Sequence, residues 1–163
     1  MNQAQWQSEA MAEALALARE AATNGEIPVG AVVVDREGRI IGRGRNGRES
    51  GDPLGHAEIY AIAEAAREIG DWRLEGTTMV VTLEPCAMCA GALVNARVER
   101  LVFGARDPKA GFCGSLGNLV QDARLNHRLQ VEGGFMEDDS RQLLQDFFRQ
   151  LRQRDRTERW QSG

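Results

Sequence analysis

Residues 77–103 read TTMVVTLEPCAMCAGALVNARVERLVF. Two apolar runs with several β-branched residues, 77–83 and 98–103, predict strands. Between them, residues 86–96 carry their apolar side chains on one side of a short predicted helix. A strand, a helix and a second strand predict a parallel crossover, which places the chain among α/β proteins.

The segments before this crossover extend the predicted sheet. Residues 3–24 have apolar side chains at a helical period that stops at Asn24-Gly25. Residues 29–34 and 39–42 are apolar runs separated by a turn-like segment, so they predict a hairpin. Residues 43–55 are rich in glycine, arginine and polar residues without periodicity, which predicts a loop.

A second helix follows this loop and ends at Gly70; its apolar spacing is carried by Ile59, Ile62, Ala63, Ala66 and Ile69. After the crossover, residues 104–126 predict a glycine-rich loop and residues 129–131 a short edge strand. A closing helix is marked by Leu143, Leu144, Phe147, Phe148 and Leu151. We expect Trp6, Phe147 and Phe148 in the core and the last ten residues to be frayed. The predicted fold is a three-layer α/β/α sandwich with a central mixed five-stranded sheet.

Length and composition indicate one globular domain, residues 1–163. With 163 residues, 42% of them hydrophobic, the chain can bury a core without cross-links. No leader-like or membrane-spanning apolar run is present, and three cysteines, two of them three positions apart, suit a metal or redox role in a reducing compartment. We therefore expect a cytoplasmic protein without membrane contact.

Charge points only weakly to a polyanionic partner. The net charge is −4, although arginines gather in two segments: Arg36, Arg39, Arg43, Arg45 and Arg48, and then Arg141, Arg149, Arg152, Arg154, Arg156 and Arg159. For any one of these arginines, a solvated arginine-rich face is a better explanation than a nucleic-acid site.

Two short motifs carry the chemistry: His56-Ala57-Glu58 at the predicted loop-to-helix junction, and Pro85-Cys86-Ala87-Met88-Cys89 at the start of the crossover helix. Proline is favoured at a helix start, so Cys86 and Cys89 fall in the first turns with both sulfurs on one side. One histidine and two cysteines provide three zinc ligands, and a three-ligand site leaves a fourth position for water, as catalytic zinc requires.

Glu58 is the candidate for proton transfer. Residues two apart on a helix do not share a face. His56 must therefore lie at or before the helix start if its ring is to reach the metal while Glu58, in the first turn, reaches the water. Zinc lowers the pKa of its water and a carboxylate moves protons, which together suit hydrolytic attack on a carbon that bears an amine.

Other interpretations compete for the same residues. A Cys-x-x-Cys pair also occurs in thioredoxin-like redox sites and in structural zinc knuckles, for which Cys113 and His127 are available as further ligands. Glu58 would then have no role. We interpret Cys113 as a small buried residue, His127 as a hydrogen-bonded structural histidine and Glu84 as structural. Residues 42–47 fit G-x-G-x-x-G, but no helix follows directly, so no nucleotide cofactor is expected.

The chain resembles the bacterial tRNA adenosine deaminase family from about the first helix to Phe148. H-x-E and P-C-x-x-C form the signature of zinc deaminases. The resemblance extends to residues 27–32 (IPVGAV), Asn46, 52–53 (DP), 56–58 (HAE), 81–86 (VTLEPC), 88–92 (MCAGA), 103–107 (FGARD), 114–116 (GSL) and 126–128 (NHR).

This resemblance implies a cytidine deaminase-like fold and one zinc ion per subunit, bound by His56, Cys86 and Cys89, with Glu58 as the catalytic proton shuttle. It further implies that Asn46, Val29 and Asp107 contact the substrate. Family members are homodimers that convert a wobble adenosine to inosine in the anticodon stem-loop of tRNA. Unstacked loop bases are the usual targets of sequence-specific RNA recognition.

The chain departs from the family in the loop before His56. Residues 47–55 read GRESGDPLG, whereas the family commonly has a slightly longer loop with Thr-Ala directly before His-Ala-Glu. The same scaffold also serves guanine, cytosine and cytidine deaminases. A deaminase of free bases or nucleosides is therefore the alternative, and a zinc-stabilised binding module without catalysis is a third possibility.

Overall fold

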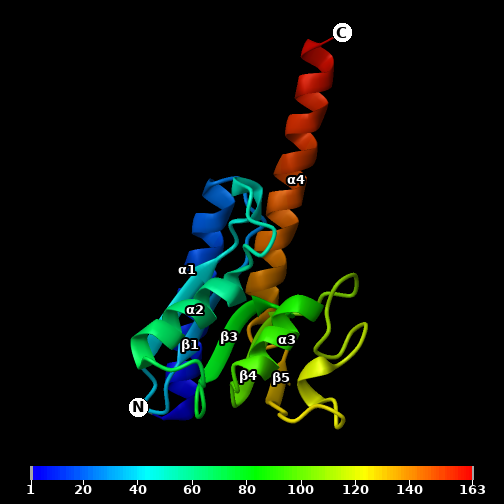
Figure 1. The fold of residues 1–163 in the computed structure, drawn as a ribbon. Helices are drawn as coiled ribbons and strands as arrows, with labels where there is room; N and C mark the ends of the chain where they lie inside the picture. Colours follow the sequence, from blue (N-terminus) through cyan, green and yellow to red (C-terminus); the bar gives the residue numbers. More distant parts are fainter. Residues whose placement is uncertain (1, 163) are drawn as a thin grey trace.

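A computed structural model describes residues 2–162 and has one five-stranded sheet (Figure 1). The strands are β1 (Gly30–Val34), β2 (Ile40–Arg45), β3 (Thr78–Leu83), β4 (Arg100–Ala105) and β5 (Gln130–Gly133). Their order in the sheet is β2-β1-β3-β4-β5. The β1 strand pairs antiparallel with β2 and β3, whereas β3/β4 and β4/β5 are parallel, so the predicted mixed sheet and the parallel crossover are confirmed.

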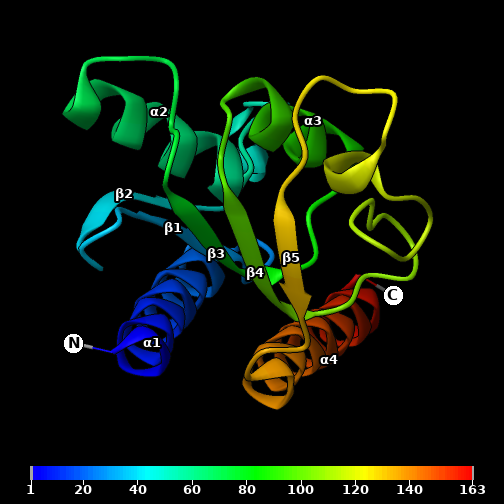
Figure 2. The ribbon, with the colours of Figure 1, turned by 90° about the horizontal axis from the view of Figure 1, so that it is seen from below.

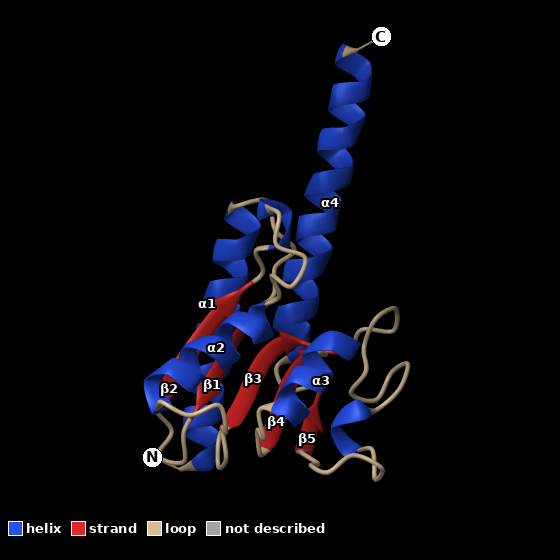
Figure 3. Ribbon diagram, viewed as in Figure 1, coloured by secondary structure: helices blue, strands red, loops and turns tan. Residues whose placement is uncertain are grey.

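Helices cover both faces of the sheet. In Figure 2, α1 (Gln3–Thr23) and α4 (Glu137–Gln161) lie on one side, and α2 (Ala57–Ile69) and α3 (Ala87–Asn95) lie on the other. A long, mostly irregular segment joins β4 to β5 (Figure 3). The predicted three-layer α/β/α sandwich is therefore confirmed. None of the helices within residues 2–162 has the length and apolar character needed to span a membrane.

Strand alternation divides the core into two clusters. Along β1, Ala31 and Val33 face the cluster that includes α2 and α3, whereas Val32 and Val34 face the cluster that includes α1. All four side chains are fully buried, because successive strand residues point to opposite faces and both faces are covered by helices.

Strand β2 is longer than its predicted span, since it continues through Gly44 to Arg45 into the segment we expected to be a loop. A Cβ added at Gly44 would lie 2.0 Å from the Ala57 carbonyl oxygen, and one at Gly42 would lie 2.3 Å from that of Ala61. The glycines therefore allow α2 to approach the strand closely. They belong to a helix–strand contact and not to a flexible loop.

The residues that α2 buries most fully are not its most apolar residues. Ala57, Ala61 and Ala65 are fully buried, whereas Ile69, at the end of the predicted apolar stripe, is 45% exposed. Small side chains lie inside because the space between α2 and the two glycines of β2 leaves no room for isoleucine.

Two expectations for the chain end are wrong. The α4 helix continues to Gln161, so the last residues are helical instead of frayed. Phe147 is half-buried and Phe148 is 39% exposed, so neither lies in the core. The second half of α4 extends beyond the rest of the molecule (Figure 1). Its helical form follows from the scarcity of helix breakers, because between Leu151 and Gln161 it contains neither glycine nor proline.

Candidate functional site

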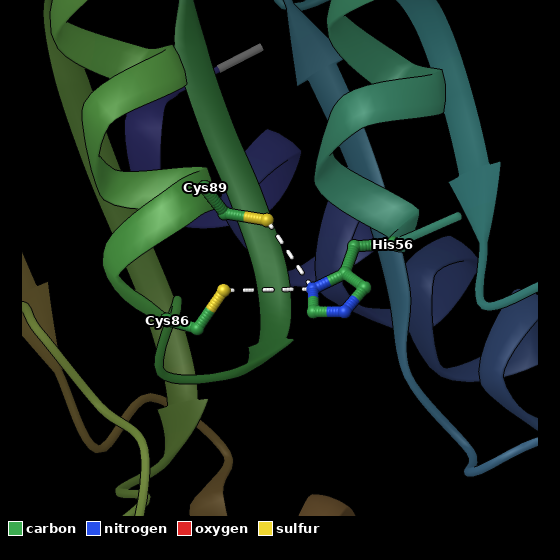
Figure 4. A group of neighbouring side chains, drawn as sticks. All are labelled: His56, Cys86 and Cys89. Atoms are coloured by element: carbon green, nitrogen blue, oxygen red, sulfur yellow. Dashed lines mark hydrogen bonds between the residues drawn. The ribbon is translucent and has the colours of Figure 1, made fainter. Parts of the chain in front are cut away.

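The starts of α2 and α3 bring three metal-ligating side chains together. The Nδ1 atom of His56 lies 3.5 Å from the Cys86 sulfur and 3.5 Å from the Cys89 sulfur, and the side chains point toward one another (Figure 4). The three ligand atoms lie within 4.8 Å of one another. Zn–S and Zn–N bonds at the tetrahedral angle separate sulfur from nitrogen by about 3.6 Å, so the residues fit a tetrahedral zinc ion.

Helix geometry explains how the two cysteines meet. Cys86 is the residue directly before α3 and Cys89 lies in its first turn, so Cys86 lies one position earlier than we predicted. A hydrogen bond from the Cys89 thiol, assisted by backbone amides at the helix start, lowers the pKa of Cys86 to about 5. The same interaction and burial raise the pKa of Cys89. A bound divalent cation would favour the thiolate form of both cysteines.

His56 and Glu58 lie on either side of the first residue of α2. His56 is the residue before α2, with extended backbone, and Glu58 lies in the first turn. Glu58 is only 4% exposed, and burial raises the pKa of its carboxyl, while the neighbouring Cys89 thiol opposes this rise. A raised pKa suits a group that accepts and returns protons near neutral pH. This position of His56 is the one expected from the sequence.

Glu84 is structural, as predicted, although it precedes the Pro-Cys motif. Its buried carboxylate accepts hydrogen bonds from the backbone N–H groups of Asp107, Cys113 and Ser115 at 3.0–3.2 Å and from the Ser115 hydroxyl. Burial alone would raise the pKa of Glu84, but these donors hold it below its usual value. The residue thereby fastens the β4–β5 segment to the start of α3.

The three residues expected to contact substrate have different surroundings. Val29 is buried and its carbonyl accepts the backbone N–H of Asn46 at 3.1 Å, so these two residues are neighbours. Asn46 is half-buried and lines a cavity of about 730 Å³. The Asp107 carboxylate accepts the backbone N–H groups of Lys109 and Ala110, each at 3.1 Å, and so shapes its own loop. Their contact with substrate stays a prediction.

Cys113 and His127 lie outside the ligand group. Cys113 is 3% exposed, and its thiol donates to the Pro85 carbonyl at 3.9 Å. His127 Nε2 bonds to the Val98 carbonyl at 2.7 Å. Both residues therefore have the structural environments that the sequence indicated.

The sequence reasoning missed Glu26 and Tyr60, which line the same cavity as Asn46. Glu26 is 5% exposed, and its carboxylate accepts the backbone N–H of Glu49. The Tyr60 hydroxyl donates to Asp52 at 2.6 Å. Both residues line the cavity next to Asn46. The only signal in the sequence was that each stands within three residues of a recognised motif.

Comparisons with known proteins agree with this geometry. The model of the MafB19-like deaminase family matches residues 5–152. The tRNA-specific adenosine deaminase of Bacillus subtilis is 49% identical over 150 residues, which cover 91% of this chain and 92% of that protein.

Solved structures give the same class. One, from a study of A-to-I editing by tRNA:A34 deaminases at the wobble position, has a TM-score of 0.80 at 41% identity and covers 84% of this chain and 99% of that one. A guanine deaminase from Nitrosomonas europaea has a TM-score of 0.74 at 26% identity and covers 85% and 82%.

Fold and site together define a protein of the deaminase class. The B. subtilis protein is close to half identical to this chain, and the match covers nearly all of both proteins. The chain therefore belongs to the tRNA-specific adenosine deaminase family.

Proposed function

We propose that this protein hydrolytically deaminates adenosine to inosine at the wobble position of a tRNA anticodon loop. The observation that carries the proposal is the meeting of His56, Cys86 and Cys89 at tetrahedral spacing, with the buried Glu58 carboxylate beside them. The choice of substrate is supported by the names of the B. subtilis relative and of the A-to-I editing structure.

The chemistry assigns a separate task to each group. His56, Cys86 and Cys89 would hold one zinc ion per subunit, which when bound lowers the pKa of water and supplies hydroxide at neutral pH. Glu58 takes one proton from the attacking water and delivers it to the purine ring nitrogen. It then takes the second proton from the added hydroxyl and delivers it to the amine, which leaves as ammonia. Burial keeps Glu58 out of bulk solvent, so the proton returns to the substrate.

The substrate would enter as an unstacked loop base, because a base inside a duplex cannot reach the site. We assign Asn46, Val29 and Asp107 to substrate contacts on the strength of the family resemblance. Leu54 and Leu116 are each 56% exposed on loops fastened near the site, which favours a homodimer that covers them. The free cysteines suit the reducing cytoplasm, where tRNA is available.

The test is inosine formation on a stem-loop RNA with adenosine at the wobble position. A matched RNA carries the same adenosine inside the stem, and free adenosine, guanine and cytidine are assayed in parallel. We expect product on the loop RNA alone, with loss after chelation and recovery with Zn²⁺. Turnover confined to a free base or nucleoside would overturn the RNA assignment. It would favour the second candidate, a free-base deaminase. The similarity to the guanine deaminase structure supports that candidate.

A further inference from the structure

The segment between β2 and α2, residues 47–55, is fastened at its base. The backbone N–H of Gly47 donates to the Gly55 carbonyl at 2.9 Å, which closes the segment directly before His56. The Glu49 N–H donates to both carboxylate oxygens of the buried Glu26, at 3.0 and 3.1 Å. A segment with such anchors is a formed loop and not an open tether.

A third anchor comes from α2 itself. The Tyr60 hydroxyl donates a hydrogen bond of 2.6 Å to the Asp52 carboxylate, and the Asp52 carboxylate also accepts the Leu54 N–H at 2.9 Å. Hydrogen bonds to an ionised acceptor are shorter and stronger than neutral ones. Asp52 therefore joins the outer part of the loop to the first turn of the helix that carries Glu58.

Gly55 is required for this third anchor. A Cβ at position 55 would lie 2.8 Å from the Tyr60 hydroxyl oxygen and 2.9 Å from the Asp52 carbonyl oxygen. Gly55 and the Tyr60–Asp52 bond therefore belong together as one local arrangement of this chain.

The fastened loop forms one wall of the cavity of about 730 Å³ that Asn46 lines; Gly47, Glu49, Ser50 and Tyr60 also line it. We propose that Tyr60 is a positioning residue which, through Asp52, holds residues 47–55 as a preformed rim for the RNA strand. The proposal rests on the proposed function, since it specifies how that site binds its substrate.

We expect loss of the preformed rim to weaken substrate binding. A loop that is already ordered costs less conformational entropy when substrate binds than a loop that must be ordered first. No side chain of residues 47–55 belongs to the metal-ligand group or is Glu58. Loss of the rim should therefore raise KM for RNA and leave kcat nearly unchanged.

The experiment compares Tyr60→Phe, Asp52→Asn and the double variant with the wild type on the stem-loop RNA. Asp71→Asn is the matched control, because Asp71 also accepts a loop N–H, that of Arg73, at the opposite end of α2. We expect KM to rise about five- to tenfold in Tyr60→Phe, which removes the hydrogen bond, and by no more than this in Asp52→Asn, in which a neutral amide replaces the ionised acceptor. The double variant should match Tyr60→Phe, because its second change acts on a bond that is already lost. Zinc content, kcat and melting temperature should match those of the control.

Amide hydrogen exchange supplies a readout independent of activity. Exchange at Glu49 and Leu54 should be faster in Tyr60→Phe than in the wild type and the control. Unchanged KM in Tyr60→Phe, or a fall in kcat without a change in KM, would overturn the proposal. A wild type that is inactive on RNA but active on a free base would instead overturn the proposed function.

Discussion

The starts of α2 and α3 are tightly packed, whereas the second half of α4 is exposed. At the first location Ala57 and Cys89 are fully buried and Glu58 is 4% exposed. Along α4 the only buried residue is Ser140, and Trp160 near its end is 88% exposed. Where backbones are in close contact, the position of each atom depends on its neighbours, so small changes should have large effects. The exposed helix end should tolerate the same changes.

The strongest test of this contrast is Cys86→Ala. Two remaining ligands hold a zinc ion poorly, so we expect substoichiometric zinc and activity at background. Metal analysis of the purified variant together with the inosine assay measures both. Cys113→Ala is the matched control: it also removes a thiol, but one outside the ligand group, and should retain zinc. Stoichiometric zinc in Cys86→Ala would contradict the assignment.

Glu58→Ala separates catalysis from metal binding. Loss of the proton shuttle should lower kcat by about 10²- to 10⁴-fold while zinc remains bound. The isosteric Glu58→Gln keeps the volume and should show a similar loss, which excludes a packing explanation. Single-turnover kinetics and metal content provide the measurement. Activity equal to that of the wild type in both variants would favour the non-catalytic binding module.

Gly44→Ala tests the close contact between β2 and α2. The added Cβ would lie 2.0 Å from the Ala57 carbonyl oxygen, so α2 must shift, and the free energy of unfolding should fall by about 1–3 kcal/mol. Gly91→Ala in α3 is the matched control, because its Cβ meets nothing within 4 Å. That change should stabilise the protein by about 0.5–1 kcal/mol through helix propensity. Urea unfolding measures the free energy of unfolding of both variants. Equal changes in Gly44→Ala and Gly91→Ala would contradict a close contact at Gly44.

The smallest effect is expected at the exposed end of α4. Trp160→Ala should change the free energy of unfolding by no more than about 0.5 kcal/mol, since the side chain is 88% exposed. Leu93→Ala, in the fully buried part of α3, should lower it by about 2–5 kcal/mol. Chemical denaturation of both variants measures the difference. A large loss in Trp160→Ala would show that this end packs against something in solution.

Periodicity predicted the order and type of the main elements because helices and strands repeat their burial over a few neighbouring residues. It was wrong where a contact between elements outweighs local preference. Gly44 stands in a segment with the composition of a loop, yet it pairs in a strand because α2 lies against it. Phe147 and Phe148 had the character of core residues, yet Phe147 is half-buried and Phe148 is 39% exposed.

The sequence by itself determined the ligand types and the pairing of Cys86 with Cys89, because residues three apart at a helix start are neighbours in any fold. Only the tertiary structure placed His56 at 3.5 Å from both sulfurs, since it lies 30 residues before Cys86 and reaches it through the packing of two helices on one sheet. Only the tertiary structure shows the hydrogen bond between Tyr60 and Asp52 and the closure of residues 47–55 at their base. Such contacts depend on where the chain turns, and spacing along the chain does not encode that.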